Sequence, residues 1–462
     1  MDMTDFGSKK NDPAVSRRSF LKTSAAAGLG AAVGGALLAR PSPDPASSQA
    51  ESPGRPGDLP VALIGAGEQG RVLMESCLRI PGIRIAAVCD IWSYSQQYAR
   101  GYLRKYGQDP AVYEDYRDLL AKEKGLAAAI VATPDWLHAE QTNACLENGL
   151  HVYCEKEMSN SLEKARTMVE TARRTGRLLQ IGHQRRSNPR YLHAIDRLIR
   201  DKKLLGRVGL AYAQWNRSKA DLLGWPKTYP IDPAKLQAYG YADMTEFRNW
   251  RWYKKFGGGP IVDLGSHQID LFAWVFGCNP SAVFASGGVD YYKGREWFDN
   301  VMAVYEFQTA EGAARAMYQV QTTTKYGGFY EVFMGDDGAI QISEVAQRGN
   351  WALREAHAPE WDSLVKEGLL LSEAPVIQKV DTKNIFVDVR VTAEAGRWPF
   401  PVDLAKPAHQ PHLENFFDAI RRGTALTCPA SLAYESAVAV LKVNEAVRTK
   451  SLVRFRPGDF KA

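Results

Sequence analysis

The chain has little of several features that would place it in a specialised class. It contains six cysteines among 462 residues and no CxxC pair, so we expect free, buried thiols and no disulfide framework. The formal net charge of +6 is too small and too dispersed to indicate nucleic-acid binding. Beyond the N-terminal region, no apolar run is long enough to span a bilayer. With 45% hydrophobic residues, the length is sufficient for two domains with cores of their own.

The N-terminal region resembles a twin-arginine export signal. It reads SRRSFLK at residues 16–22, with Arg17 and Arg18 adjacent, and continues into an Ala/Gly-rich stretch. That stretch has about fifteen residues, which is short of the ~20 that span a membrane. A Pro/Ser-rich linker with a small-x-small cleavage site at Ser48–Ala50 follows. We expect export of the folded protein to the periplasm, with only transient membrane contact. The alternative is an ordinary basic tail.

A glycine-rich turn follows the first buried strand pattern. Val61–Ile64 is a short apolar run, and GAGEQG at residues 65–70 supplies a GxGxxG motif before a helical period. Gly65 permits the tight turn, Gly67 lets a pyrophosphate approach the backbone, and Gly70 lets the helix pack on the strand. The pattern predicts dinucleotide phosphates at the helix N-terminus.

Strand and helix patterns then alternate. Strands are predicted at 83–90, 126–134, 151–156 and 178–182, with helices near 93–106, 138–149 and 160–174. This alternation predicts a doubly wound parallel sheet. Asp90 ends the second strand, where an acid accepts hydrogen bonds from ribose hydroxyls and repels a 2′-phosphate, so NAD is favoured over NADP. The alternative is a Rossmann-like domain that binds no dinucleotide.

The stretch GGGPIVDLGSHQID at residues 257–270 contains candidate catalytic residues. Asp263 and His267 are four residues apart and share one face of a helix, whereas Asp270 lies on a different line and is assigned a structural role. Oxidation of an alcohol needs a base, and His267 has an ordinary pKa of ~6.5. Asp263 can orient that imidazole or hold a substrate hydroxyl. The alternatives are a core histidine or a divalent-metal site formed by all three, and we expect no metal.

In this order, GAGEQG, ATPDWLH, YCEKE and GGGPIVDLGSHQID resemble the glucose–fructose oxidoreductase/inositol dehydrogenase/MocA family. HLENFFDAIRRG and CPASLAYESAVAVL resemble the end of its second domain, so the resemblance covers about residues 59–455. It implies a Rossmann domain followed by an α/β domain with a large, open, mostly antiparallel sheet. It also implies NAD(P)-dependent oxidation or reduction of sugars or polyols, in dimers or tetramers.

The resemblance also implies roles for individual residues. Lys156 reaches the reacting hydroxyl, where its cation can stabilise a developing alkoxide, and forms the catalytic set with Asp263 and His267. Glu157 stands where the family has proline, so the turn that directs Lys156 is less rigid and carries a second carboxylate. The implied cofactor-binding residues are Gly65, Gly67, Glu68, Gln69, Gly70, Asp90, Thr133, Pro134, His138, Glu155, Gln184 and Arg251.

Two further segments have more than one interpretation. Arg185, Arg186 and Arg190 either bind an acidic sugar or phosphate or form a solvated basic turn. The aromatic-rich segment 212–256 either stacks on sugar faces or, as we favour for most of its rings, fills a core or an oligomer interface. The predicted domains are an export signal and linker (1–57), a cofactor domain (58–182) and a substrate and oligomerisation domain (183–458).

The sequence therefore predicts a periplasmic, homo-oligomeric oxidoreductase with a tightly bound nicotinamide cofactor. Its substrate is a sugar, glycoside or polyol hydroxyl. One alternative is a redox-neutral lyase or glycosidase that oxidises, eliminates and then reduces with the same cofactor. Another is a cofactor-binding protein without catalysis, acting as a sensor or scaffold.

Overall fold

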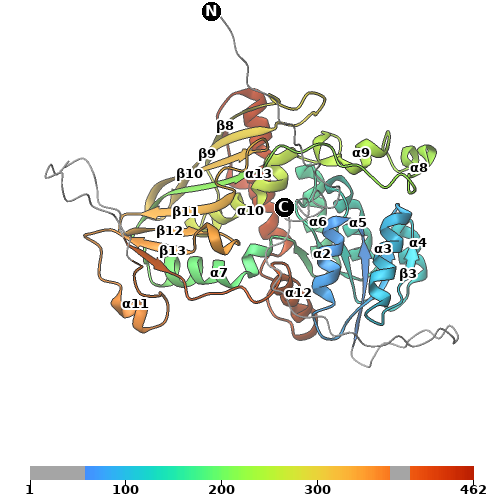
Figure 1. Ribbon diagram of the computed structural model, residues 1–462, viewed down its shortest axis with the longest axis horizontal. Coiled ribbons are helices and arrows are strands. Elements are labelled where there is room, and N and C mark those ends of the chain that lie inside the picture. Colours follow the sequence, from blue (N-terminus) through green and yellow to red (C-terminus); the bar gives the residue numbers. More distant parts are fainter. Residues whose placement is uncertain (1–57, 375–395) are drawn as a thin grey trace, which may run out of the picture. The chain divides into compact units, whose positions relative to one another are not determined.

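The computed structural model describes residues 58–374 and 396–462. The predicted export signal and linker, residues 1–57, lie outside the described residues. Within these ranges the chain forms two β-sheets with helices packed against them (Figure 1).

The first sheet has six parallel strands in the order β3-β2-β1-β4-β5-β6. The strands are β1 (Leu59–Ile64), β2 (Ile83–Cys89), β3 (Ala111–Tyr113), β4 (Ala128–Val131), β5 (His151–Cys154) and β6 (Leu179–Ile181). The run Val61–Ile64 is fully buried, as expected for a strand with helices on both faces. The strand order reverses between β1 and β4, which opens a crevice at their carboxyl ends, where such sheets bind ligands.

Helices connect these strands. They are α2 (Glu68–Cys77), α3 (Ser93–Arg104), α4 (Tyr116–Lys122), α5 (Asp135–Glu147) and α6 (Leu162–Thr175). Two short elements, β3 and α4, were absent from the sequence prediction because three and seven residues give little periodic signal. Helix α5 begins at Asp135, directly after Pro134, rather than at His138 as predicted.

The second sheet has nine strands in the order β14-β13-β12-β11-β7-β10-β9-β8-β15. Among the described strands of this sheet, the β7–β10 pair is parallel and the other pairs are antiparallel. The strands are β7 (Val208–Asn216), β8 (Ala282–Gly288), β9 (Asn300–Thr309), β10 (Gly312–Gln321), β11 (Phe329–Gly335), β12 (Gly338–Ile342), β13 (Trp351–Arg354), β14 (Arg397–Pro399) and β15 (Val453–Arg454). Burial alternates residue by residue along β9 and β10, so one face of this sheet is covered and the other is open. The two sheets confirm the predicted fold class.

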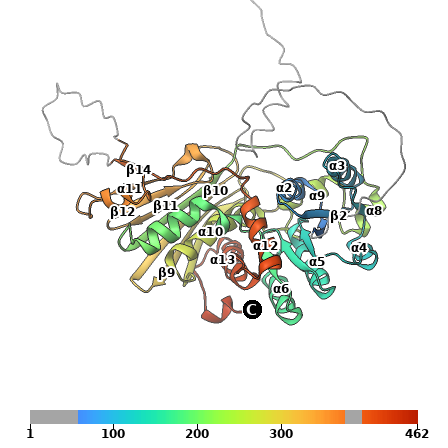
Figure 2. The same cartoon turned by 90° about the horizontal axis from the view of Figure 1, so that it is seen from below.

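Helices α10 (Gly259–Phe276) and α13 (Ala430–Thr449) pack against the covered face of the second sheet and against each other. Helix α12 (Gln410–Arg422), although late in the chain, packs against α2 of the first sheet (Figure 2). The remaining helical elements are η2 (Gln184–Ser187), α7 (Pro189–Tyr191), η3 (Leu192–Asp201), α8 (Pro233–Ala238), α9 (Met244–Arg248), η4 (Trp250–Trp252), η5 (Ala346–Arg348), α11 (Asp362–Lys366) and η6 (Pro457–Phe460). None of the helices in the described ranges is both long enough and apolar enough to cross a membrane.

Candidate active site and cofactor cleft

The glycine loop between β1 and α2 has the close backbone packing that its motif requires. Gly65 has φ +91°, and a Cβ there would lie 2.7 Å from the Ala132 backbone. A Cβ at Gly70 would lie 1.9 Å from the Gly65 carbonyl oxygen. At Gly67, by contrast, no atom lies within 4 Å of the added Cβ. The loop therefore presents open backbone at the N-terminus of α2, which suits a bound phosphate.

Asp90 follows β2 and holds this loop in place. Its Oδ2 accepts a hydrogen bond from the Ala66 amide at 2.8 Å, and its Oδ1 accepts one from the Trp92 amide, also at 2.8 Å. Burial raises the pKa of Asp90, although these two amides partly oppose the effect. The carboxyl thus supports the loop backbone as well as lying beside the expected ribose site.

A second group of predicted cofactor-binding residues lies at the end of β5. The Glu155 carboxylate is buried and accepts a hydrogen bond from Nε2 of Gln69 at 3.1 Å. The same Gln69 nitrogen lies 3.0 Å from Nε2 of His409, which precedes α12. A Cβ at Gly182 would lie 2.8 Å from the Glu155 carboxylate, so that glycine makes room for it. The structure therefore brings Gln69 and Glu155 together, and it adds His409, which the motifs did not indicate.

His138 is inside the protein rather than on the cleft surface. Its side chain is 1% exposed, with Nδ1 at 2.7 Å from the Glu157 carbonyl and Nε2 at 2.7 Å from the Thr133 carbonyl. Burial lowers its pKa to about 4. Thr133 in turn donates its hydroxyl to Gln141 at 2.6 Å. These contacts join the turn after β4, which includes Pro134, to the segment that carries Lys156.

Three segments meet at Asp263. Nζ of Lys156 donates to the Asp263 backbone carbonyl and lies 3.4 Å from its Oδ1. Nε of Arg251 donates to the same Oδ1 at 3.1 Å. Burial opposes ionisation of Asp263, but Lys156 and Arg251 outweigh it and hold the pKa of that carboxyl well below its ordinary range. Asp263 is thus a carboxylate between two cations, and it positions Lys156.

His267 lies one turn further along α10. Its ring centroid is 5.6 Å from that of Trp215, and its Nδ1 has no hydrogen-bond partner in the described parts of the chain. Asp263 makes its hydrogen bonds with Lys156 and Arg251, so it does not orient the imidazole as one of our sequence hypotheses held. Burial, followed by the charges of Lys156 and Arg185, lowers the pKa of His267 well below 6.5. The imidazole is therefore neutral at physiological pH.

Several buried polar atoms near this site also lack partners within the described residues. They include both ring nitrogens of His183, Oε1 of Gln184 and Oε2 of Glu157. Buried polar groups are normally hydrogen-bonded, so such a cluster fits a place where a polar ligand or water completes the contacts. Together with the open backbone at Gly67, these atoms indicate that the chain is suited to a dinucleotide and a hydroxylated substrate.

Asp135 is a further residue that the sequence reasoning missed. It is the first residue of α5, and it is buried near Lys156 and Asp263. Burial, together with the charge of Asp263, raises its pKa to about 7, although Lys156 opposes the rise. Its place between Pro134 and His138 in the ATPDWLH motif was the only sequence indication. It adds a carboxyl that titrates near neutrality to the site.

The Glu157 side chain, next to Lys156 in the sequence, lies inside the protein. It is 1% exposed, and Oε1 accepts the Met158 amide at 2.8 Å. Burial raises its pKa to about 8, with the Met158 amide opposing the shift. The added carboxylate that the sequence predicted next to Lys156 is thus mostly protonated at neutral pH.

We predict that Glu157→Gln makes stability less dependent on pH. In the wild type, the folded state retains a proton that the unfolded state releases above its ordinary pKa of 4.5. Stability is therefore lost as pH rises from that value through about 8. Glutamine cannot ionise, so the variant should gain stability relative to wild type between about pH 5 and pH 9, by a few kcal/mol.

Urea unfolding at several pH values measures this difference. Glu140→Gln is the control, because that side chain is 51% exposed in its pair with Arg117. Parallel pH profiles for wild type and Glu157→Gln would contradict the assignment of a buried, protonated carboxyl.

The arginines after β6 correct the sequence interpretation. Arg185 is 1% exposed and donates to Glu331 at 2.6 Å and to Glu344 at 3.1 Å. Arg186 is also buried and pairs with Asp270. Arg190 is buried too and donates to backbone carbonyls of residues 343 and 402. They are neither a solvated turn nor a free anion site, because this segment runs beneath the second sheet and meets buried carboxylates there.

Metal binding was one of the alternatives for α10. The described residues contain no group of three or more His, Cys, Asp or Glu side chains placed to hold a metal ion. Asp270 accepts hydrogen bonds from Arg186 and from the Ser436 hydroxyl, so both its oxygens serve the protein interior.

Comparison with known proteins places this geometry in context. The chain is 26% identical over 290 residues to inositol 2-dehydrogenase from Rubrobacter xylanophilus. The matched region covers 62% of this chain and 71% of that protein. It is 31% identical over 222 residues to D-glucoside 3-dehydrogenase from Escherichia coli. This matched region covers 47% of this chain and 54% of that protein. The structure of levoglucosan dehydrogenase in complex with NADH and levoglucosan shares the fold, with a TM-score of 0.65 and 18% identity over 86% of this chain and 99% of that one.

Family models match both parts of the chain. Residues 59–183 match an oxidoreductase family with an NAD-binding Rossmann fold, and residues 233–341 match the GFO/IDH/MocA C-terminal domain. Together these ranges make up about half of the chain, and they agree with the motifs in the sequence. The chain belongs to the GFO/IDH/MocA family of oxidoreductases.

Proposed function

We propose that this protein transfers hydride between a tightly bound nicotinamide cofactor and a carbon bearing a hydroxyl in a sugar, glycoside or polyol. The observation that carries the proposal is the meeting of Lys156, Asp263 and Arg251, with His267 one turn away on α10. This set combines a neutral base with a cation for a developing alkoxide. Names of relatives such as inositol 2-dehydrogenase support the substrate class.

The residues divide the chemistry as follows. The nicotinamide, when bound, accepts or donates the hydride. His267 takes the hydroxyl proton on a ring nitrogen. Lys156, held by Asp263, stabilises the negative charge that develops on the substrate oxygen. In the reverse direction His267 returns the proton, so the same groups serve reduction.

For the cofactor we propose NAD rather than NADP. The Asp90 carboxyl lies where ribose hydroxyls are expected, and an acid there accepts hydrogen bonds and repels a 2′-phosphate. NAD-binding is also the description of the family that matches residues 59–183.

A panel of sugars and polyols tests the function. The protein is loaded with NAD, and nicotinamide fluorescence is followed after each addition. We expect at least one sugar or polyol to reduce the bound cofactor. Glycosidic cleavage without net reduction would indicate the redox-neutral alternative. No reduction and no cleavage with any member, in protein shown to bind NAD, would favour a non-catalytic role.

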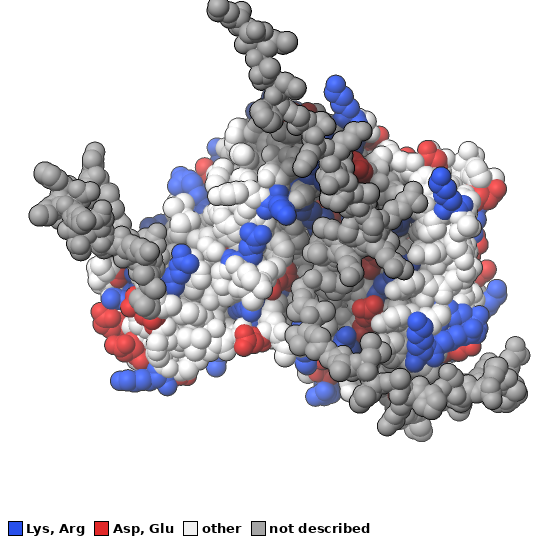
Figure 3. Space-filling model, in the orientation of Figure 1, with Lys and Arg blue, Asp and Glu red and all other residues white. Residues whose placement is uncertain are grey.

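We propose a second copy of the chain as the partner of the open sheet face. Phe284, Val304 and Met317 stand opposite one another on β8, β9 and β10 and are 48%, 38% and 43% exposed. Such a continuous apolar row favours association with a matching surface. On the face shown in Figure 3, charged side chains of both signs are interspersed with uncharged surface. Sedimentation of the purified protein measures the oligomeric state.

Export is the third part of the proposal. We predict that replacing Arg17 and Arg18 by lysine leaves the folded protein in the cytoplasm, because the adjacent arginines identify the predicted signal. Fractionation of cells that express each form measures this, with Lys9→Arg and Lys10→Arg as the control substitutions outside the motif. Normal export of the double variant would contradict the signal assignment.

A further inference from the structure

Part of the wall of the cofactor cleft comes from the second domain. We call residues 217–256, between β7 and α10, the aromatic strap; it contains α8, α9 and η4. Figures 1 and 2 both show α8 and α9 beside α3 of the first sheet. The Trp92 indole donates to the Tyr229 carbonyl at 2.7 Å, and Lys235 pairs with Glu114 at 2.5 Å. These contacts attach the strap to the cofactor domain.

Apolar packing fixes the strap further. Trp92 shares a buried cluster with strap residues Ile231, Leu236, Tyr241, Met244 and Phe256. Most rings of the segment therefore form a core against the cofactor domain, as the sequence analysis favoured. Residues carried on the strap consequently hold a defined position over the end of β2.

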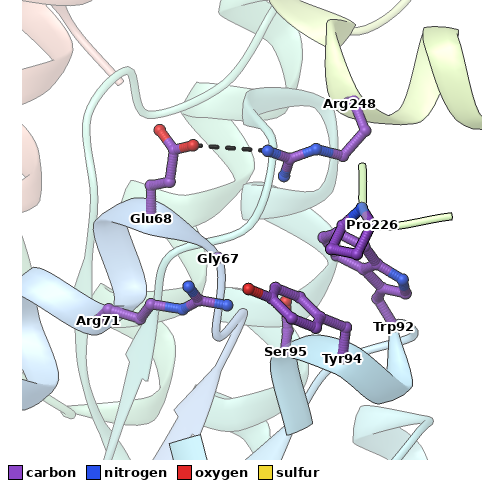
Figure 4. Close-up of a pocket in the computed structure, with 8 residues that line it drawn as sticks. All are labelled: Gly67, Glu68, Arg71, Trp92, Tyr94, Ser95, Pro226 and Arg248. Carbon is purple, nitrogen blue, oxygen red and sulfur yellow. Dashed lines mark hydrogen bonds and ion pairs between the residues drawn. The ribbon is translucent and has the colours of Figure 1, made fainter. Parts of the chain in front are cut away.

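A pocket opens between the strap and the glycine loop (Figure 4). Its lining includes Glu68 and Arg71 from α2, Trp92 and Tyr94 from the segment after β2, and Pro226 and Arg248 from the strap. The pocket therefore adjoins both Gly67 and the chain that follows Asp90, which is the expected place of the adenosine half of a dinucleotide.

Two guanidinium groups flank this pocket. Arg248 is 19% exposed, lies over the Trp92 ring at 5.1 Å and approaches Oε1 of Glu68 at 3.5 Å. Arg71 lies over the Tyr98 ring at 3.8 Å and uses its Nε to contact the Ala66 carbonyl at 3.2 Å. Figure 4 shows Arg248 turned toward Glu68 and Arg71 turned toward Tyr94.

The Arg248–Glu68 pair leaves Arg248 available to another anion. At 3.5 Å the contact is longer than the 2.7–2.9 Å of a strong charge-assisted hydrogen bond. The Glu68 side chain is 74% exposed, so it can turn toward solvent with little loss of interaction free energy. The Nε of Arg248 donates to the Gly224 carbonyl at 3.2 Å, so a phosphate in the pocket would pair with the two terminal nitrogens of the guanidinium.

We propose that Arg248, together with Arg71, forms a phosphate-binding subsite for the adenosine half of the cofactor, in addition to the amides of the glycine loop. This inference rests on the proposed dinucleotide binding. Through Arg248 the strap contributes directly to nucleotide affinity, so the second domain, and not the Rossmann domain alone, retains the cofactor. The phosphate recognised is either the diphosphate common to NAD and NADP or the 2′-phosphate of NADP.

Calorimetric titration with adenosine and with ADP tests the subsite. In Arg248→Met we expect ADP affinity to fall about 10- to 100-fold, the usual effect of losing a hydrogen bond to a charged group, and adenosine affinity to stay within about twofold. Glu68→Gln should bind ADP as tightly as wild type or more tightly, since it removes a competing carboxylate. Arg354→Met is the matched control, because Arg354 is 20% exposed and pairs with an exposed glutamate at 3.0 Å.

Titration with 2′,5′-ADP separates the two phosphates. A loss in Arg248→Met that appears with 2′,5′-ADP and not with ADP still supports the subsite. It assigns the subsite to the 2′-phosphate and contradicts the proposed preference for NAD. Equal losses of ADP affinity in Arg248→Met and Glu68→Gln would overturn the proposal, because the pair would then act only as a structural link. Equal losses for adenosine and ADP would overturn it as well. Arg248→Lys, which retains the charge, guards against misfolding of the methionine variant.

Failure of this inference is distinguishable from failure of the proposed function. ADP binding to the wild type reports on the dinucleotide site without any sugar. The sugar panel reports on catalysis without any change at Arg248. A protein that oxidises a sugar but binds both ADP and 2′,5′-ADP equally well with and without Arg248 would retain the function and lose the subsite.

Discussion

Replacing His267 by alanine should slow turnover of a productive sugar by ~10²–10⁴, the usual effect of losing a general base. The imidazole is neutral, carries an unpaired Nδ1 and lies one helical turn from Asp263. Without it, the imidazole nitrogen that we propose as the acceptor of the hydroxyl proton is missing from that position. Binding of NADH should remain near normal, because the glycine loop, Asp90 and Glu155 are untouched.

Steady-state kinetics and nicotinamide fluorescence measure these two quantities separately. His193→Ala is the control, since His193 is half-buried and bonded to the Leu369 carbonyl, on a different helical segment. Added imidazole should restore part of the lost rate only in the His267 variant. Near-normal turnover in folded His267→Ala would mean that this residue is a core histidine.

Replacing Arg185 by methionine should lower the free energy of unfolding by about 3–5 kcal/mol. Arg185 neutralises Glu331, which is 0% exposed, and Glu344. Burial raises the pKa of Glu331 while Arg185 lowers it. Removal of the guanidinium therefore leaves a buried carboxyl whose ionisation has a high free-energy cost. The loss should therefore increase as pH rises above the ordinary range of a glutamate.

Urea unfolding measures the effect. Arg197→Met serves as the control, because that arginine is 68% exposed in its pair with Asp201 and should contribute less than about 1 kcal/mol. Adding Glu331→Gln to Arg185→Met should recover part of the loss, since it removes the uncompensated charge. Equal effects for Arg185→Met and Arg197→Met would show that the buried pair contributes nothing beyond a surface pair.

Some features of the site depend only on neighbours in the sequence. The spacing of Gly65, Gly67 and Gly70 determines a turn with open backbone. Gly65 and Gly70 allow close packing within the turn and against the adjoining strand, whereas Gly67 leaves the backbone uncovered. Asp263 and His267 share a helical face because four residues make about one turn of a helix. The alternation of strand and helix patterns is likewise visible in local periodicity, and it predicts the parallel sheet.

Other features depend on which distant segments meet, and only the tertiary structure decided them. Lys156, Arg251 and Asp263 come from three different segments, and their contact made Asp263 a partner of two cations instead of the orienting group of His267. Arg185 belongs to a run of basic residues that is typical of a solvated turn. Its side chain is nevertheless buried, because it pairs with Glu331 of β11. Arg248 faces the glycine loop only because the strap folds back over β2. Local sequence patterns indicate the periodicity of helices and strands and the type of each side chain. Burial and charge pairing are set by long-range packing, and a single sequence does not specify that packing residue by residue.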